Sequence, residues 1–181
     1  MPGSHWMIVT TPENHEISRE RGYTLLGLKA RHRKKAERML PGDRILIFIS
    51  HERVFACTAT VTSGFFEDHR VIWQNNERRN DVFPWRIPLQ PDFMLDEAEH
   101  LDAYQIAPRL QYVKRWAPED WPLAFQGQVH LLSSSDFSIV EHEMRRLGAG
   151  PRQRARPQPP SESGEPPARV AEAVAGANHS G

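Results

Sequence analysis

Two apolar segments separated by a short polar link constrain the fold of this chain most strongly. They are residues 43–50 (DRILIFIS) and 54–63 (VFACTATVTS), and both are rich in β-branched and aromatic side chains. Such segments are typical of strands, and the link from His51 to Arg53 fits an antiparallel hairpin. We expect this hairpin at the centre of a sheet.

Four further segments are short, apolar and bounded by turn residues, which is also typical of strands. They cover residues 5–10, 71–73, 82–89 and 128–132. Pro84 and Pro88 lie in one of them, and because proline cannot donate to a sheet ladder, this strand is expected at an edge or at a bulge. With the hairpin, about six strands are expected.

Two segments predict longer helices. Residues 31–40 contain strong helix formers and precede Pro41-Gly42, which stops a helix. After serines 133–135, four apolar residues recur at helical spacing and predict an amphipathic helix that packs on the sheet: Phe137, Val140, Met144 and Leu147. Residues 12–21 and 103–110 are shorter candidates. Because strands and helices do not alternate regularly, the sequence predicts an α+β fold, a small mixed β-barrel flanked by helices.

The last 34 residues, 148–181, differ in composition from the rest of the chain. They hold six of the 15 prolines and contain no aromatic residue, leucine or isoleucine. Ordering the backbone of one residue costs about 1–2 kcal/mol, and this segment has little apolar surface to compensate. We therefore expect one domain over residues 1–147 and a disordered tail rich in Pro, Arg, Gly and Ala over residues 148–181, with at most a short helix around residues 168–175.

Charge and cysteine content narrow the class of protein. The 23 basic and 23 acidic residues cancel, which argues against a wholly basic DNA coat. The chain shows no apolar run of about 18 residues and no signal-peptide pattern, so a soluble, cytoplasmic protein is expected. The single cysteine, Cys57, excludes an internal disulfide and a cysteine-rich zinc site, and its position within a strand favours a buried core role.

Sequence motifs for catalysis are missing. The chain has no GxSxG, HExxH or Walker A motif, and no GxGxxG after a strand. Histidines stand near carboxylates in residues 67–69 and 97–100, but they lack the spacing of a metal site. No catalytic residue, metal or cofactor is therefore expected.

Two other features point to nucleic acid. Six cations crowd into residues 29–38 against the single acid Glu37, and on one helix Arg31, Lys34, Lys35 and Arg38 would share a face suited to phosphates. Five tryptophans lie in separate segments, and aromatic faces hold unstacked bases. These are Trp6, Trp73, Trp85, Trp116 and Trp121. An ordinary core with a charged helix is the alternative interpretation.

Seven short motifs in order along the chain resemble the EVE domain family, members of the PUA-like superfamily and relatives of the YTH domains. The motifs are residues 5–14 (HWMIVTTPEN), 40–44 (LPGDR), 54–63, 66–68 (FED), 72–73 (IW), 83–87 (FPWRI) and 135–137 (SDF). The resemblance extends over about residues 5–147. It implies a PUA-like, mostly antiparallel β-barrel of about six strands flanked by short helices.

The resemblance also implies a function and a site. EVE domains are thought to take a modified base of DNA or RNA, of the methylated cytosine or adenine class, into an aromatic-lined pocket. The matching pocket positions are Thr10, Thr11, Asn14, Gly27, Leu28, Lys29, Ser50, Trp73 and Trp85. The expected phosphate contacts are Arg31, Arg33, Lys34, Lys35 and Arg38. Nucleic acid is thus the expected partner, with no membrane contact and no prediction of oligomeric state.

The chain departs from the family pattern at two places. His15 stands where many members have tryptophan, and residues 22–30 lack the tryptophan often found before the glycine. Residues 115–122 look like an insertion without an assigned role. Two alternative functions stay open: an amidohydrolase of the related ASCH type acting on a modified nucleoside, for which Lys29, Thr11 and Glu13 supply the residue types, and a small-molecule or protein-interaction module.

Overall fold

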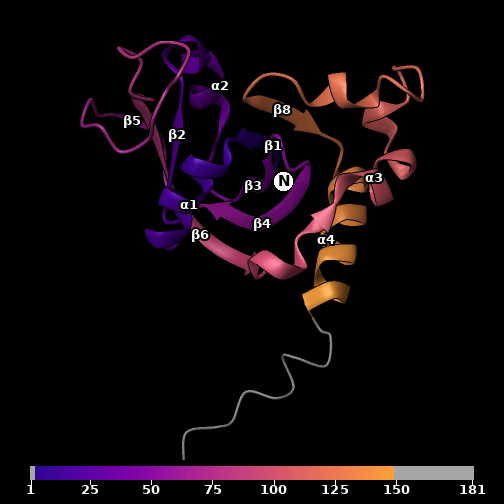
Figure 1. Cartoon of the computed structure of the whole chain (residues 1–181). Helices are drawn as coiled ribbons and strands as arrows, with labels where there is room; N and C mark the ends of the chain where they lie inside the picture. The colour runs from indigo at the N-terminus through magenta and orange to yellow at the C-terminus, as the bar shows by residue number, and fades with distance from the viewer. Residues whose placement is uncertain (1–2, 149–181) are drawn as a thin grey trace, which may run out of the picture.

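A strongly curled sheet organises residues 3–148, the part of the chain that this computed structural model describes (Figure 1). Six strands form its continuous path in the order β2-β6-β4-β3-β1-β8, while β5 pairs with β6 and β7 pairs with β4. The strands are β1 (His5–Thr10), β2 (Leu25–Leu28), β3 (Arg44–Ile49), β4 (Val54–Val61), β5 (Phe66–Glu67), β6 (Trp85–Met94), β7 (Leu101–Asp102) and β8 (Val129–Leu132). Only the β1–β3 pair is parallel among these described strands.

Helices lie around this sheet (Figure 1). The α-helices are α1 (Pro12–Glu20), α2 (Arg33–Arg38), α3 (Ala103–Ile106) and α4 (Ser134–Gly148). Short 3₁₀ turns cover Ala30–His32, Glu97–Glu99, Ala107–Arg109, Gln111–Val113 and Trp121–Phe125. The expected α+β fold, a mostly antiparallel curled sheet of about six strands flanked by short helices, is confirmed.

The side chain of Gln128 joins the two end strands of the path. Its Nε2 donates to the carbonyl of Gly27 at 2.9 Å, and its Oε1 accepts from the backbone N–H of Lys29 at 2.8 Å. These are the two bonds that a neighbouring strand would make, so an amide side chain beside β8 takes the place of a backbone ladder with β2. The curled sheet is thereby closed at this end.

The core has two parts because β3 is buried on both faces. Ile45, Ile47 and Ile49 belong to the cluster inside the curl, and Leu46 and Phe48 belong to the cluster on the other side of the sheet. Side chains alternate between faces along a strand, so a strand covered on both faces reads as a continuous apolar run. The hairpin predicted from residues 43–63 is therefore confirmed as β3 and β4 at the sheet centre.

The amphipathic helix after the serines is confirmed as α4. Phe137, Val140 and Met144 are buried against the outer face of the sheet. Leu147 was expected on the same face but is 38% exposed, and Gly148, four positions after Met144, packs against Phe93 instead. The predicted tail, apart from Gly148, lies outside the described residues, as does the helix suggested at 168–175.

Several predicted elements were wrong in extent. Residues 71–73 form no strand, because this segment is held by side chains rather than by a ladder, and the four-residue strand β2 was missed. The helix predicted over 31–40 is a 3₁₀ turn followed by α2, which ends at Arg38. The strand predicted at 82–89 is β6, which continues to Met94 and lies between β2 and β4 instead of at an edge.

The proline-rich strand nevertheless has the expected irregularity. The register between β4 and β6 shifts where Thr58 pairs with Phe93 and Ala59 with Pro91. An extra residue on one strand increases the local twist and bends the sheet. Strand β6 pairs with β2 through residues 85–88 and with β4 through residues 89–94, and the bulge lies within the second part.

Candidate functional site

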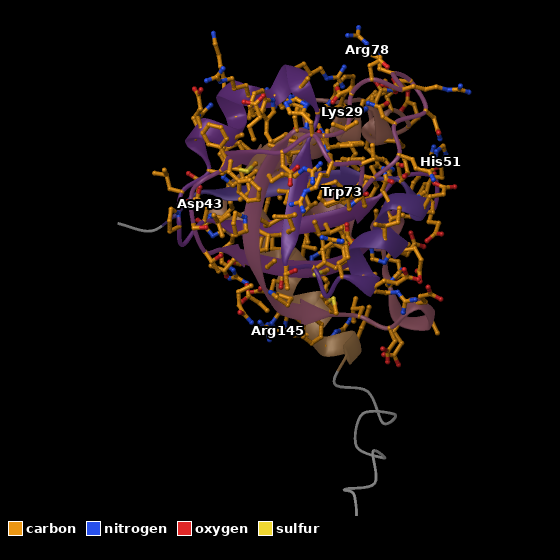
Figure 2. The ribbon with its side chains drawn as sticks, turned by 90° about the vertical axis from the view of Figure 1, so that its left-hand side faces the viewer. Lys29, Asp43, His51, Trp73, Arg78 and Arg145 are labelled. Carbon is orange, nitrogen blue, oxygen red and sulfur yellow. The ribbon has the colours of Figure 1, made fainter. Side chains whose placement is uncertain are left out.

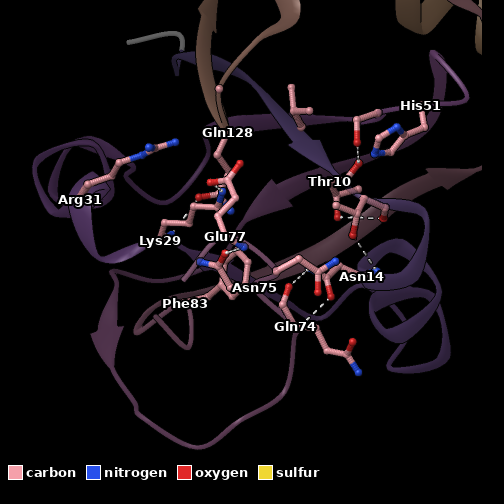
Figure 3. A pocket seen from close by; sticks show the side chains of 15 residues that line it. Thr10, Asn14, Lys29, Arg31, His51, Gln74, Asn75, Glu77, Phe83 and Gln128 are labelled. Atoms are coloured by element: carbon pink, nitrogen blue, oxygen red, sulfur yellow. Dashed lines mark hydrogen bonds and ion pairs between the residues drawn. The ribbon is translucent and has the colours of Figure 1, made fainter. Parts of the chain in front are cut away.

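A polar pocket of about 350 Å³ lies at the end of the parallel strand pair (Figure 3). Because β1 and β3 run in the same direction, their carboxyl ends meet there: the backbone N–H of Ser50 donates to the carbonyl of Thr10 at 2.8 Å, and the Ser50 hydroxyl donates to the same oxygen at 3.1 Å. Helix α1 starts at the same edge, with Thr11 as its N-cap accepting from the N–H of Asn14 at 3.2 Å. Of the residues predicted for base binding, Thr10, Thr11, Asn14, Lys29 and Ser50 line this pocket.

Asn14 fixes the opposite wall of the pocket. Its Nδ2 donates to the carbonyl of Gln74 at 2.8 Å, and its Oδ1 accepts from the N–H of Gln74 at 2.9 Å (Figure 3). Asn14 is 6% exposed, so this side chain holds residue 74 much as a neighbouring strand would. Asn14 was predicted for the pocket and does line it, but its amide is engaged with the loop, and the loop residues 74–77 add further polar groups to the lining.

A second set of contacts ties the same loop to the strand β2 side of the pocket. The Lys29 ammonium forms an ion pair with Glu77 at 3.2 Å, and this contact lowers the pKa of Glu77. The Asp81 carboxylate accepts from the N–H of Ala30 with both oxygens at 3.1 Å. Loop 74–81 is thus attached at both sides of the cavity that it covers.

Phe83 is an aromatic residue of the pocket lining, where it is 6% exposed. It adopts φ of 56°, an uncommon conformation for a bulky residue, and lines both the main pocket and a smaller cavity of about 30 Å³ next to it. Gly27 and Trp73 line only the smaller cavity. The indole of Trp73 is 5% exposed and donates to the hydroxyl of Ser18 at 2.9 Å, so it stands behind the pocket wall rather than at its surface.

Two residues of the predicted pocket lie in the core. Leu28 is fully buried, and Trp85 is 9% exposed within the inner apolar cluster. The indole N–H of Trp85 donates to the carbonyl of Ala30 at 2.8 Å. Neither residue lines the pocket, so in the structure both are core residues.

The basic residues predicted to hold phosphates do not form one helical ridge. Arg31 precedes α2 in the 3₁₀ turn and lines the pocket, with its side chain at the rim in Figure 3. Lys35 is half-buried, where its Nζ donates to the carbonyl of Val129 at 3.0 Å and burial lowers its pKa. Lys34 is exposed, and no ion pair involves it within residues 3–148.

The two remaining cations of this set rest on aromatic rings. The Arg33 guanidinium lies 5.3 Å from the ring centre of Trp85 and pairs with Glu37, and that of Arg38 lies 5.6 Å from the ring of Trp6. Cation–π contacts of exposed guanidinium groups contribute about 0.5–1 kcal/mol. Arg33 and Arg38 therefore have structural contacts of their own, and Arg31 is the member of the set that reaches the cavity.

Of the three residues considered for an amidohydrolase, only two come to the pocket. Thr11 and Lys29 both line the pocket, but Glu13 is exposed and is not part of the lining. The Thr11 oxygen caps α1, and the Lys29 ammonium is paired with Glu77. Cys57 is 1% exposed, and burial raises the pKa of its thiol to about 12, as expected for a core residue.

Sequence reasoning missed the residues that complete the pocket. They are Val9, His51, Gln74, Asn75, Asn76, Glu77, Phe83, Gly127 and Gln128. The polar run 74–77 (QNNE) and the glutamine before β8 carry no motif, and only their contacts with Asn14 and Gly27 place them at the site. Phe83 belongs to the motif 83–87, in which the resemblance pointed to Trp85. Figure 2 shows Lys29 and Arg78 at one end of the molecule and Arg145 at the other.

The fold is shared with several solved structures. The YTH domain of Mmi1 superposes with a TM-score of 0.59 at 7% identity, covering 82% of this chain and 92% of that domain. A hypothetical protein from Leishmania major gives a TM-score of 0.55 at 14% identity, covering 81% of this chain and 97% of that one. A complex of the YTH domain-containing protein mmi1 with RNA gives 0.53 at 8% identity, covering 80% of this chain and 87% of that one.

These likenesses define a fold of the kind found in YTH domains. At identities this low they show the architecture alone. No protein-family model matches the chain, and no curated protein matches it by sequence. No helix within residues 3–148 is long and apolar enough to cross a membrane.

Proposed function

We propose that this protein is a nucleic-acid-binding module that takes one unstacked nucleotide, carrying a modified base, into the pocket at the ends of β1 and β3. The observation that carries the proposal is the pocket itself. Its volume of about 350 Å³ falls in the range of small-ligand sites, about 300–1,000 Å³. Its wall combines the aromatic ring of Phe83 with the polar loop 74–77.

The chemistry of this wall suits a nucleobase. A base removed from its stack costs a few kcal/mol to expose, and an aromatic surface together with edge-directed hydrogen bonds compensates for that cost. Phe83, which is 6% exposed, offers a small apolar surface, and the exposed side chains of Gln74 and Asn76 offer donors and acceptors. The two hydrogen bonds between the Asn14 amide and the backbone of Gln74 hold this loop in place without a ligand.

The charge at the rim suits a phosphate backbone. Arg31 lines the pocket, and Arg78 lies at the same end of the molecule (Figure 2), whereas the charge of Lys29 is paired with Glu77. Phosphate contacts set affinity and register, whereas groups inside a pocket set base preference. The solved complex of the YTH domain-containing protein mmi1 with RNA, which shares this fold, adds support for RNA as the nucleic acid.

We propose a binding module rather than an enzyme. Glu13, the carboxylate that the hydrolase alternative requires, does not line the pocket, and Thr11 and Lys29 have structural partners. The added methyl group of a modified base would contribute on the order of 1 kcal/mol when buried, which gives a preference rather than absolute discrimination.

Fluorescence titration with short oligonucleotides tests the proposal. The panel contains single-stranded RNA and DNA, plain and with methylated adenine or cytosine, each at two salt concentrations. We expect one modified oligonucleotide to bind more tightly than its plain counterpart at both salts. Arg31→Glu should weaken every oligonucleotide and flatten the dependence on salt, because it removes a phosphate contact.

Two variants act as controls for this titration. Arg145→Glu makes the same charge change at the far end of the molecule and should leave binding unchanged (Figure 2). Asn76→Ala removes an exposed amide that lines the pocket, and should reduce the preference between bases while keeping the salt dependence. Equal loss with Arg31→Glu and Arg145→Glu, or no binding by any oligonucleotide, would overturn the proposal.

A further inference from the structure

The carboxylate of Glu77 lies among three cations at the rim of the main pocket. Lys29 forms an ion pair with it at 3.2 Å, and Arg31 lines the same pocket (Figure 3). The contact with Lys29 lowers the pKa of Glu77, and the positive charges of Arg31 and Arg78 lower it further. Lys29, Arg31 and Arg78, which we call the rim cations, therefore all lie near this one carboxylate.

The rim cations have few anionic partners. Among residues 3–148, no ion pair involves Arg31 or Arg78, and Lys29 pairs with Glu77 alone. The Asp81 carboxylate, the next acidic group along the loop, accepts from the backbone N–H groups of Ala30 and Phe83. Three cations thus face two carboxylates, and the rim keeps a net positive charge.

The Glu77 side chain can leave this position without a change in the fold. It is 74% exposed, whereas the side chain of Lys29 is 19% exposed and its backbone N–H donates to Gln128. Asn75 holds the turn that carries Glu77, since its Oδ1 accepts from the N–H groups of Glu77 and Arg78, both at 3.1 Å. A rotation of the Glu77 side chain alone would therefore free the Lys29 ammonium while the loop stays in place.

We propose that the rim cations form a phosphate subsite and that Glu77 occupies it in the free protein. This inference rests on the proposed function and deepens it by naming a group that regulates the same site. Phosphate oxygens accept charge-assisted bonds from ammonium and guanidinium groups as a carboxylate does, so a phosphate of the ligand replaces Glu77 at Lys29. Because an exposed ion pair is weak, this competition lowers the affinity without blocking binding.

Titration with a short single-stranded RNA compares the natural chain with Glu77→Gln. We expect Glu77→Gln to bind about threefold more tightly and to depend more steeply on salt, because Lys29 no longer exchanges one anion for another. Glu20→Gln makes the same change at the exposed end of α1, outside the pocket lining, and should have no effect. Equal affinity of the natural chain and Glu77→Gln, or an equal gain with Glu20→Gln, would overturn the inference.

A second background tests whether Glu77 acts through Lys29. In Lys29→Gln, the ion pair is already lost, so the further change Glu77→Gln should increase the affinity clearly less than it does in the natural chain. An equal gain in both backgrounds would show that Glu77 does not compete for Lys29, and this outcome also overturns the inference.

Two small probes separate the phosphate subsite from base recognition. Inorganic pyrophosphate should shift the backbone amide resonances of residues 77–78 at lower concentration in Glu77→Gln than in the natural chain. That result without any RNA binding would support the subsite and contradict the proposed function, whereas RNA binding with no effect of Glu77→Gln would contradict the subsite alone. Adenosine 5′-monophosphate identifies the source of the phosphate: affinity equal to that of RNA indicates a free nucleotide, and weaker affinity indicates a strand.

Discussion

The indole of Trp73 lies directly against the backbone of Gly27. A Cβ atom built on Gly27 would come within 2.3 Å of Cζ3 and 2.6 Å of Cε3 of the indole, closer than real side chains approach. Strand β2 therefore accepts no side chain at this position while Trp73 keeps its place. Both residues line the small cavity next to the pocket, so the position of Trp73 at the site depends on the absence of a side chain at Gly27.

Gly27→Ala should displace Trp73 and destabilise the protein by about 1–3 kcal/mol, the usual range for an overpacked core. Urea unfolding followed by tryptophan fluorescence measures the loss. Gly64→Ala is the matched control, because a Cβ there meets nothing within 4 Å, and it should leave the free energy of unfolding nearly unchanged. Equal stability of the two variants would show that Trp73 moves at no cost.

Asn14→Ala should release loop 74–77 from α1. The variant removes both bonds to the backbone of Gln74, so we expect a loss of about 1–2 kcal/mol and faster hydrogen exchange at the Gln74 amide. Asn14→Asp keeps an acceptor for the Gln74 N–H but loses the donor to the Gln74 carbonyl. Its stability should therefore lie between that of the natural protein and that of Asn14→Ala. Unchanged hydrogen exchange at the Gln74 amide in Asn14→Ala would contradict the role of Asn14 in holding this loop.

Asp136 should be important for the segment that follows α3. Its carboxylate is 1% exposed and accepts from the backbone N–H groups of Gln111 and Tyr112 at 3.0 and 2.9 Å. Hydrogen bonds to a charged group contribute about 1.5–3 kcal/mol each, so Asp136→Ala should cost about 3 kcal/mol in chemical denaturation. The exposed Asp120→Asn is the comparison, and an equally small effect of both changes would refute this role.

Acidification should weaken the fold through His15. Burial lowers its pKa from 6.5 to about 4 in the folded protein. Between these two pH values, His15 therefore binds a proton in the unfolded chain but not in the folded protein. This contribution is fully present above pH 6.5 and is lost as the pH falls toward 4, by up to about 3 kcal/mol. The free energy of unfolding should therefore fall less steeply in His15→Phe than in the natural protein, and parallel pH curves would contradict the prediction.

Local patterns in the sequence determined the central part of the fold. The continuous apolar run of β3 and the β-branched residues of β4 predict a hairpin, and the spacing of Phe137, Val140 and Met144 predicts α4. These elements could be read from neighbouring residues because each buries its side chains with its own periodicity. The resemblance to EVE domains also predicted one pocket for Thr10, Thr11, Asn14, Lys29 and Ser50, and these five residues line one pocket in the structure.

Tertiary contacts decided the rest of the site. Residues 71–73 have the composition of a strand but lie in a loop, because their neighbour Gln74 is held by Asn14, which is 60 positions away. Gln128 reaches Gly27 across 101 positions, and Lys35 turns inward to the carbonyl of Val129 instead of facing solvent. Such contacts depend on which segments the curled sheet brings together. Local sequence propensities cannot predict contacts between residues that lie so far apart in the chain. The sequence thus determined the strands and the helix that form the barrel, while the closure of the barrel decided which polar side chains meet in the pocket.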